Sequence, residues 1–337
     1  MIRISFDELT GTLCRILERS GFENERAKAC ARLFAETTLD GVHSHGVNRF
    51  PRFLEMIQNG TIDIHGRPEL VRKFAAIEQW DGRSGPGNLN ASACMARAIH
   101  LSQEFGIGCV ALANTNHWMR GGTYGWQAAE AGAIGICWTN TMPNLPAWGT
   151  AIPNLGNNPL VVAVPRPGGH IVLDMAMSQF SFGALASYRE RGLLLPVDGG
   201  FDITGSLTRD PAAIETSQRP LPIGYWKGSG LAIVLDMMAA MISGGLATHQ
   251  ILQDPLRETS LSQVFICLSP SKIQSEDAST RISDEIIGFI LQSPSSGEPI
   301  RYPGQKVVET RTENLAHGIP VRKSLWNELS SLLQGAV

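Results

Sequence analysis

The stretch GVHSHGVNRF, residues 41–50, holds the side chains best suited to acid–base chemistry. His43 and His45 flank Ser44, and Arg49 follows four residues after the second histidine. A histidine can donate or accept a proton near neutral pH. An arginine can hold a carboxylate through two parallel hydrogen bonds. The spacing therefore suits an acid–base group beside an anion clamp, and two other interpretations, a metal site and an ordinary polar turn, compete with it.

The helix expected after this stretch would position the pair. Pro51 fits only the first turn of a helix, so we expect the helix to begin near Val47 or Asn48, with His45 just before it and Arg49 in its first turn. A helix N-terminus favours a bound anion. On spacing alone, a polar turn with a solvated arginine is still the commoner arrangement.

The metal interpretation depends on His43 and His45 acting together. Two histidines around one residue can share a metal only in an extended segment, and they need further ligands. The remaining histidines fall at no metal-binding spacing: His65, His100, His117, His170, His249 and His317. We therefore predict no metal, and keep a metal-dependent lyase or hydrolase using His43 and His45 as the alternative from a different class.

Three further segments could carry chemistry. NTNHWMRGGTYGW, residues 114–126, places His117 before two glycines that would allow close approach of a ligand, although a tight turn capped by Thr123 would explain them as well. In GYWKGSG, Lys227 precedes a glycine-rich helix start that suits a phosphate, unless Ser229 merely caps the helix. Asp174 lies in an apolar run, either exposed at a strand end or buried with partners.

Other functions lack support. GIGCVA at 106–111 has the letters of a dinucleotide fingerprint, but a helix precedes it and a strand follows, so we reject a Rossmann site there. The net charge of −3 argues against general affinity for nucleic acid or anionic membranes. The six cysteines form no CxxC pair and suit reduced, buried thiols. No signal peptide or membrane span is evident, and we expect a cytoplasmic protein.

The apolar periodicity predicts an α/β protein. We expect helices over 5–21 and 24–39, the first capped by Ser5, and a third after residue 47. Strands and helices then alternate: KFAAIEQWDG is predicted as one strand that ends in a turn, and KGSGLAIVLDMMAAMI as a buried helix beginning at glycines. QVFICLSP is predicted as a strand, with helices near 277–292 and 321–334 closing the chain.

Taken together, these segments resemble the malate/L-lactate dehydrogenase-like oxidoreductases, which are distinct from the Rossmann-type enzymes. The resemblance covers nearly the whole chain and includes GVHSHGVNRFPRF, NHWMRGGTYGWQAAEAG, VLDMAMS, LPVDGGFD and YWKGSGLAIVLDM. It implies a non-Rossmann α/β fold in which a large, mostly antiparallel mixed sheet binds the cofactor. It also implies a helical lobe formed by both chain ends for substrate binding and dimerisation (1–118 with 271–337), a cofactor lobe (119–270) and a homodimer.

The resemblance further implies hydride transfer between NADH, with NADPH possible, and a small 2-oxo acid, here a sugar-derived 2,3-diketo acid. Malate, lactate, ureidoglycolate and a cyclic imino acid remain open as substrates, and so does a catalytically silent sensor. The family's S-H-G-x-x-R histidine, the proton donor, falls on His45, its arginine on Arg49, and its second histidine on His117. The cofactor contacts fall on His170, Ile171, Val172, Leu173, Asp174, Met175, Ala176, Trp226, Lys227, Gly304, Gln305 and Lys306.

The chain departs from the family pattern at two positions. Lys306 in PGQK stands where the family has an acid, and Ala176 stands where the most similar members have a serine. A lysine there would weaken a polar contact to the cofactor or accept an extra phosphate, so the choice between NADH and NADPH is open.

Overall fold

The structure, a computed structural model, describes residues 1–294 and 299–334. Its helices are α1 (Phe6–Arg19), α2 (Asn24–Leu39), α3 (Phe50–Gln58), α4 (Gly87–Phe105), α5 (Gly122–Glu130), α6 (Phe182–Glu190), α7 (Pro211–Ser217), α8 (Trp226–Ser243), α9 (Glu276–Leu291), α10 (Gln305–His317) and α11 (Lys323–Gln334), with 3₁₀ turns η1 (Val47–Arg49), η2 (Thr248–Gln250) and η3 (Pro270–Lys272). Its strands are β1 (Ile2–Ile4), β2 (Glu69–Phe74), β3 (Ile77–Asp81), β4 (Ile107–Thr115), β5 (Ile134–Thr139), β6 (Pro143–Pro146), β7 (Pro153–Gly156), β8 (Leu160–Val164), β9 (Ile171–Met175), β10 (Gly200–Phe201), β11 (Leu207–Thr208), β12 (Leu261–Leu268) and β13 (Ile319–Val321).

Seven strands form the central sheet in the order β2-β3-β4-β12-β5-β8-β9. Only β3 and β4 run parallel, and every other neighbouring pair is antiparallel. The predicted non-Rossmann, mostly antiparallel mixed sheet is therefore confirmed. Strand β9 ends the sheet, so one of its edges is not paired with another strand of the described residues.

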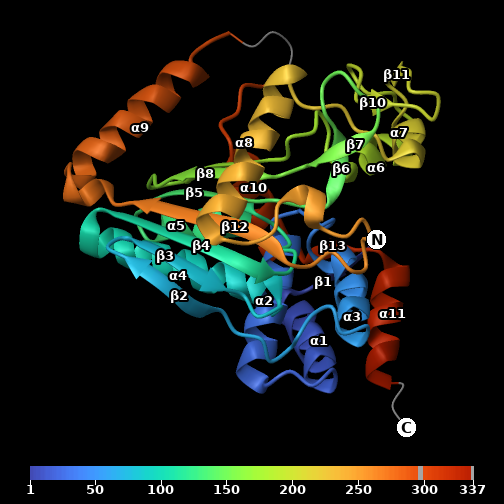
Figure 1. Cartoon of the computed structure of the whole chain (residues 1–337), viewed down its shortest axis with the longest axis horizontal. Helices are drawn as coiled ribbons and strands as arrows, with labels where there is room; N and C mark the ends of the chain where they lie inside the picture. The colour runs from blue at the N-terminus through green and yellow to red at the C-terminus, as the bar shows by residue number, and fades with distance from the viewer. Residues whose placement is uncertain (295–298, 335–337) are drawn as a thin grey trace.

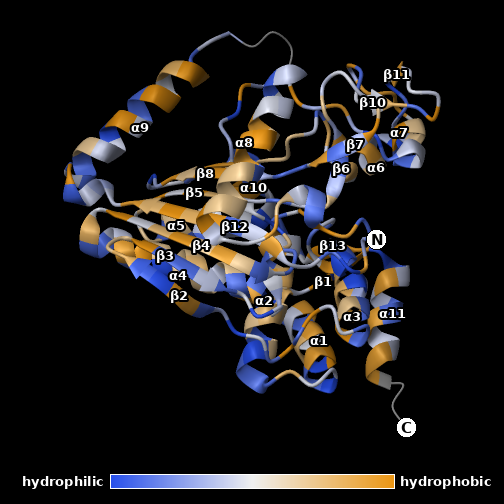
Figure 2. Cartoon of the chain, in the orientation of Figure 1, coloured by the Kyte–Doolittle hydropathy of each residue, from blue (hydrophilic) through white to orange (hydrophobic). Residues whose placement is uncertain are grey.

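Helices cover both faces of this sheet, as the alternation of side chains along its strands requires. In β4, Val110 and Leu112 pack with α4 and α5 on one face, whereas Ala111 packs with α8 on the other. Figure 1 shows α8 crossing the sheet on the side opposite α4. In Figure 2 the central strands are the most hydrophobic part of the sheet.

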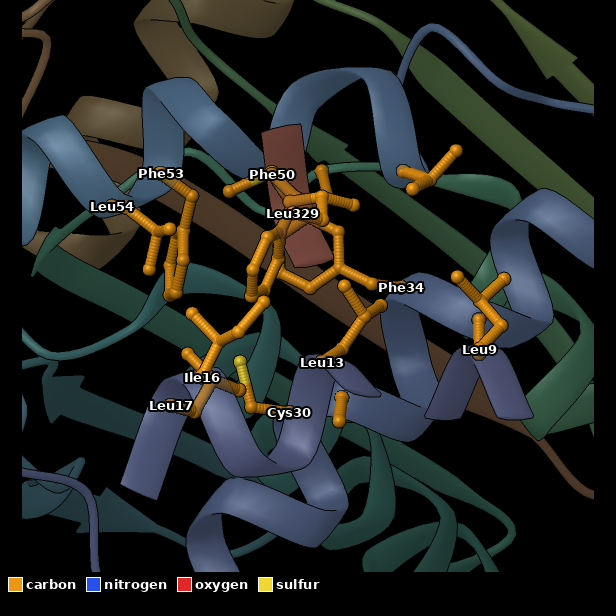
Figure 3. Packing of buried hydrophobic residues seen from close by; sticks show 14 of the residues in the cluster. Leu9, Leu13, Ile16, Leu17, Cys30, Phe34, Phe50, Phe53, Leu54 and Leu329 are labelled. Carbon is orange, nitrogen blue, oxygen red and sulfur yellow. The ribbon is translucent and has the colours of Figure 1, made fainter. Parts of the chain in front are cut away.

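A helical lobe joins the two ends of the chain. Strand β1 pairs antiparallel with β13, which brings α1 beside α11. Its core is built from α1, α2, α3 and α11, and Figure 3 shows Phe34, Phe50 and Phe53 packed among leucines. Phe34 contacts both other rings edge-on at centroid distances of 5.1 and 5.2 Å, a favourable arrangement for aromatic side chains. This packing fixes the start of α3, where the histidine–arginine stretch lies.

Strands β2 to β4 belong to the same sheet as β5, β8 and β9, although the proposed division at residues 118 and 270 would separate them. The domain limits themselves therefore stay a prediction. None of the helices among the described residues has the length and apolar character needed to cross a membrane.

Several predicted elements are found where the sequence placed them. Ser5 accepts the Glu8 N–H at the start of α1, and α2 spans the predicted 24–39. Gly106 ends α4 in a left-handed conformation before β4, which confirms that GIGCVA is a helix end entering a strand. The helices near 277–292 and 321–334 are α9 and α11.

Two predicted elements are wrong in detail. KFAAIEQWDG is not one strand, because Ala75 adopts a positive φ of 50° in a turn between the end of β2 and the start of β3; its second half, β3, is a strand that ends at Asp81 as predicted. The segment predicted as a buried helix, α8, is buried on one face only, since Met241 is 81% exposed and Met237 is 58% exposed. The apolar composition that suggested burial therefore also covers an open surface.

Candidate active site

A cavity of about 870 Å³ lies where the helical lobe meets the free edge of the sheet. Its walls come from the loop before α3, the loop between β4 and α5, strand β9, the segment after η2 and the start of α10. The first two loops bring His45, Arg49 and His117 into this one cavity. His45 and His117 are 72 positions apart in the sequence and therefore share a site only through the fold.

The two histidine rings stack on each other. Their centroids are 5.8 Å apart and their planes differ by 13°. Gly46 allows the first loop to pack this closely on α2, because a Cβ there would lie 2.4 Å from Thr38 Oγ1. The same hydroxyl accepts the Val47 N–H at 2.9 Å. The glycine of the S-H-G stretch therefore serves to anchor the loop that presents His45.

The hydrogen-bond partners of the two rings differ in kind. Nδ1 of His117 accepts the backbone N–H of Met119 at 3.0 Å, so the neutral ring carries its proton on Nε2. Nδ1 of His45 lies 3.0 Å from the hydroxyl of Ser44, which can donate or accept. A proton on Nδ1 of His117 would face the N–H of Met119, so two donors would meet without an acceptor. His45 can take up a second proton and keep its hydrogen bond to Ser44, because the hydroxyl can accept.

The electrostatic surroundings favour the neutral form of both rings. Burial, followed by the charges of Arg49 and Arg120, lowers the pKa of His45 to about 4. Burial, followed by Arg49 and His45, lowers the pKa of His117 well below its ordinary value. An anion bound at Arg49 would oppose part of this field and would raise both pKa values.

Arg49 is a half-buried cation that lacks a close carboxylate partner within residues 1–294 and 299–334. Burial and the neighbouring Arg52 lower its pKa to about 10, and Glu258 partly opposes them. The guanidinium of Arg52 is held by the carbonyl oxygen of Pro255. Arg49 is thus the cation best placed to receive a carboxylate from a ligand.

A buried network of charges closes the wall behind the histidines. Asp40 accepts one hydrogen bond from Arg120 Nη1 at 2.5 Å and two from Arg311, at 2.6 and 2.9 Å. Asp174 accepts the Gly122 N–H at 2.8 Å and lies 4.0 Å from Arg120 Nε. Burial raises the pKa of Asp174, and Arg120 and the Gly122 N–H oppose that rise. The Asp174 side chain keeps 32% exposure, which faces the cavity.

The other half of the cavity has the features that a nicotinamide cofactor requires. The Val172 N–H on the outer edge of β9 donates to the Pro303 carbonyl, so by alternation the polar backbone of Asp174 also points away from β8. Gly304 adopts a φ of 95°, and a Cβ there would crowd His170 and Val172. The side chain of Trp126 lines the same cavity, and its indole Nε1 is buried without a partner. Backbone polar groups on the free edge of β9 fit an amide-bearing ring.

The predicted cofactor residues do not all reach this cavity. Val172, Leu173, Asp174, Ala176 and Gly304 line it. The cavity lining does not include His170, Ile171, Met175, Gln305, Lys306, Trp226 or Lys227.

The structure places most of the residues outside the lining at the ends of β9, α8 and α10. His170 bonds the Arg166 N–H, and Lys306 is exposed in the first turn of α10. Trp226 and Lys227 are exposed at the start of α8. Their roles as cofactor contacts stay predictions.

The plainer interpretations of two segments are wrong. Ser229 does not cap α8, whose N-cap is Tyr225, and its hydroxyl instead accepts the Trp148 N–H. Thr123 does not cap α5, whose N-cap is Gly121 without a side-chain bond. The glycines of this loop instead allow close packing, since a Cβ on Gly122 would lie 2.7 Å from Asp174 Oδ2.

His43 stands apart from the stacked rings of His45 and His117. It is half-buried outside the cavity lining, and burial and the charge of Arg322 lower its pKa. Within residues 1–294 and 299–334, no three His, Cys, Asp or Glu side chains converge in a way that could hold a metal ion.

Sequence reasoning did not identify Ser44, Asp40, Arg120, Arg311 or Trp126 as parts of the site. Ser44 could have been noted from its place beside His45. The charge network joins residues separated by 80 and 271 positions, and no local spacing signals such contacts.

Comparison with known proteins gives consistent matches over the full fold. A family model described as malate/L-lactate dehydrogenase matches residues 4–330. The 2,3-diketo-L-gulonate reductase of Citrobacter koseri is 46% identical over 335 residues, covering 98% of this chain and 100% of that protein. The protein of the same name from Escherichia coli O1:K1 is 45% identical over 333 residues, with the same coverage.

Two solved structures share the fold at lower identity. The sulfolactate dehydrogenase of Methanocaldococcus jannaschii superposes with a TM-score of 0.91 at 28% identity, covering 99% of this chain and 97% of that one. The Δ1-piperideine-2-carboxylate reductase of Pseudomonas syringae has a TM-score of 0.88 at 27% identity, covering 98% and 100%.

Proposed function

This chain belongs to the malate/L-lactate dehydrogenase family and is an oxidoreductase, and on that premise we propose that it reduces a sugar-derived 2-oxo acid. The substrate we propose is 2,3-diketo-L-gulonate, and the product is 3-dehydro-L-gulonate. The names of the relatives at 45–46% identity support this choice over the other acids of the family.

In this proposal the cavity residues divide the work. Arg49 holds the substrate carboxylate through paired hydrogen bonds. His45 gives a proton to the oxygen of the carbonyl that is reduced, and His117 donates a hydrogen bond from Nε2 to the same oxygen. The observation that carries the assignment is the contrast at Nδ1: the Ser44 hydroxyl tolerates a doubly protonated His45, whereas the Met119 N–H keeps His117 neutral.

A nicotinamide cofactor is expected from family membership. When bound, its reduced ring supplies a hydride for the carbonyl carbon. Val172, Leu173, Asp174, Ala176 and Gly304 would hold it along the edge of β9, where backbone groups face the cavity. We propose NADH as the donor, with NADPH as the alternative because Lys306 replaces the family's acid.

We also propose that the protein acts as a homodimer. Helix α8 carries a row of exposed apolar side chains: Trp226, Leu231, Ile233, Val234, Met237, Met238 and Met241. Exposed apolar patches of this kind usually mark an interface. A second copy covering α8 would bury this row, which places the proposed interface on the cofactor lobe rather than on the helical lobe expected from the resemblance. The start of α8 also carries the predicted cofactor residues Trp226 and Lys227.

A substrate panel tests the proposed function. NADH absorbance is followed with 2,3-diketo-L-gulonate, oxaloacetate, pyruvate, the keto form of ureidoglycolate and piperideine-2-carboxylate, each with and without exhaustive chelation. The proposal expects the highest kcat/KM for the diketo acid and no effect of chelation. A higher kcat/KM for another acid would identify that acid as the substrate instead. Loss of activity on chelation would favour a metal-dependent reaction, and substrate binding without oxidation of NADH would favour a sensor.

A further inference from the structure

Arg120 is a buried cation whose hydrogen-bonding capacity is only partly used. Its side chain is 5% exposed, and it lines the cavity that holds His45 and Arg49. Nη1 donates to Asp40, whereas Nη2 makes no hydrogen bond among the described residues and is not fully covered by protein. Nε also lacks a partner, but protein atoms cover it. Since a guanidinium has five N–H donors, a ligand in the cavity would find unpaired donors at Nη2.

The charge of Arg120 is not neutralised by its neighbour. Asp40 is shared with Arg311, which makes two of its three hydrogen bonds, so one carboxylate lies between two guanidinium groups. Asp174 forms an ion pair with Arg120, but at 4.0 Å from Nε it is too far for a direct hydrogen bond. The charged residues of the cavity lining are Arg49, Arg52, Arg120 and Arg301 against Asp174 and Glu258. The lining therefore carries an excess of positive charge, which suits an electron-rich oxygen rather than an apolar group.

The position of Arg120 relative to Arg49 indicates which oxygen it can reach. Arg49, Arg120 and both histidines line the same cavity, and the ring of His117, three residues before Arg120, stacks on the ring of His45. Arg49 is placed before α3, while Arg120 follows His117 in the loop that leads to α5. A substrate held by its carboxylate at Arg49, with its reacting carbonyl at His45, would extend its next carbon toward Arg120.

We propose that Arg120 binds the oxygen on the carbon next to the reduced carbonyl, and so selects 2-oxo acids that carry a second oxo group at C3. This inference rests on the proposed function, because it places the carboxylate at Arg49 and the reacting carbonyl at His45. Arg120 acts in specificity: it binds the substrate but takes part in no proton or hydride transfer.

The chain offers a matched control for this role. Arg311 bonds the same carboxylate as Arg120, yet it lies on the far side of Asp40 and does not line the cavity. Arg120→Met and Arg311→Met each remove one guanidinium from Asp40 and leave the other in place. A purely structural effect would therefore appear in both variants, and a loss of substrate recognition would appear only in Arg120→Met.

The experiment measures kcat/KM for 2,3-diketo-L-gulonate and the competitive inhibition constant of pyruvate, which has no oxygen on C3, in the wild type and both variants. We expect Arg120→Met to lower kcat/KM for the diketo acid by about 10- to 100-fold, the range for losing a hydrogen bond from a charged donor, mainly through KM. Pyruvate inhibition should change by less than about 3-fold on the same reasoning. Arg311→Met should leave unchanged the ratio of kcat/KM for the diketo acid to the inhibition constant of pyruvate.

The outcomes distinguish a failure of the proposed function from a failure of the role of Arg120. No reduction of the diketo acid by the wild type would overturn the proposed function. If the wild type reduces it, an unchanged ratio in Arg120→Met, an equal loss in Arg311→Met, or a rise only in the KM for NADH would overturn the role of Arg120. Melting temperature and NADH binding check that each variant is folded, and Arg120→Lys, which keeps the charge near Asp40, supplies a second variant with an intermediate loss expected.

Discussion

The assignment of His45 as the proton donor makes a quantitative prediction about pH. Burial and the charges of Arg49 and Arg120 lower the pKa of His45 to about 4 in the free enzyme. Above that pH the protonated fraction of the ring falls about tenfold for each unit. Because kcat/KM reports the free enzyme, kcat/KM for reduction should fall by up to about 100-fold between pH 5.5 and 7.5.

The profile of kcat should differ from that of kcat/KM. A substrate carboxylate at Arg49 opposes the positive field on the ring, so the pKa of His45 rises in the complex and the fall in kcat moves to higher pH. His45→Gln cannot supply the proton, and we expect its kcat to drop by about 10²–10⁴-fold, with a flat profile over the same range.

Initial rates of NADH oxidation from pH 5.5 to 8, corrected for the acid decay of NADH without enzyme, give both profiles. The affinity of His45→Gln for NADH, measured by fluorescence, should match the wild type. The reasoning fails if His45→Gln keeps the slope of the wild type, or if kcat/KM for reduction rises with pH. If only His117→Gln loses the pH dependence of kcat/KM, His117 is the proton donor instead of His45.

Three further predictions concern residues near the site and the surface. His43→Asn should lower kcat by less than about 3-fold, since His43 does not line the cavity and makes no contact with the reacting groups; a loss equal to that in His45→Gln, measured in the same assay, would revive the metal interpretation. Lys306→Glu restores the family's acid. The ratio of kcat/KM for NADPH to that for NADH should then fall by about 10-fold or more, the value of one charged contact. An unchanged ratio would show that Lys306 does not determine the preference between NADH and NADPH. Met241→Glu places a charge in the apolar row of α8 and should shift sedimentation from dimer toward monomer, whereas Leu315→Glu, an exposed apolar position on α10, should not.

Much of the architecture was accessible from the sequence because strong local signals coincide with it. The capped, amphipathic α1 and the left-handed Gly106 follow from residue types at known spacing. Helix α10 was not predicted, since it is mostly polar and only Asn314 is fully buried along it. The exposure of α8 was not predictable either, because an apolar helix has the same composition whether the protein itself or a second subunit covers it.

The site was predictable only where its residues are close in sequence. His45 and Arg49 are four positions apart, and the start of α3 fixes both. The pairing with His117 follows from tertiary structure, and the Asp40 network joins three helices or loops that no short pattern connects. Conversely, the resemblance placed Trp226 and Lys227 at the cofactor, yet in the single chain they lie outside the cavity.

A crystal structure of the protein with NADH and 3-dehydro-L-gulonate would show whether one substrate joins Arg49 and His45, since two reduced partners cannot react. We expect the carboxylate to pair with the Arg49 guanidinium, and the C2 hydroxyl oxygen to lie about 3 Å from Nε2 of His45. A carboxylate bound away from Arg49, or a C2 oxygen that contacts His117 but not His45, would contradict it.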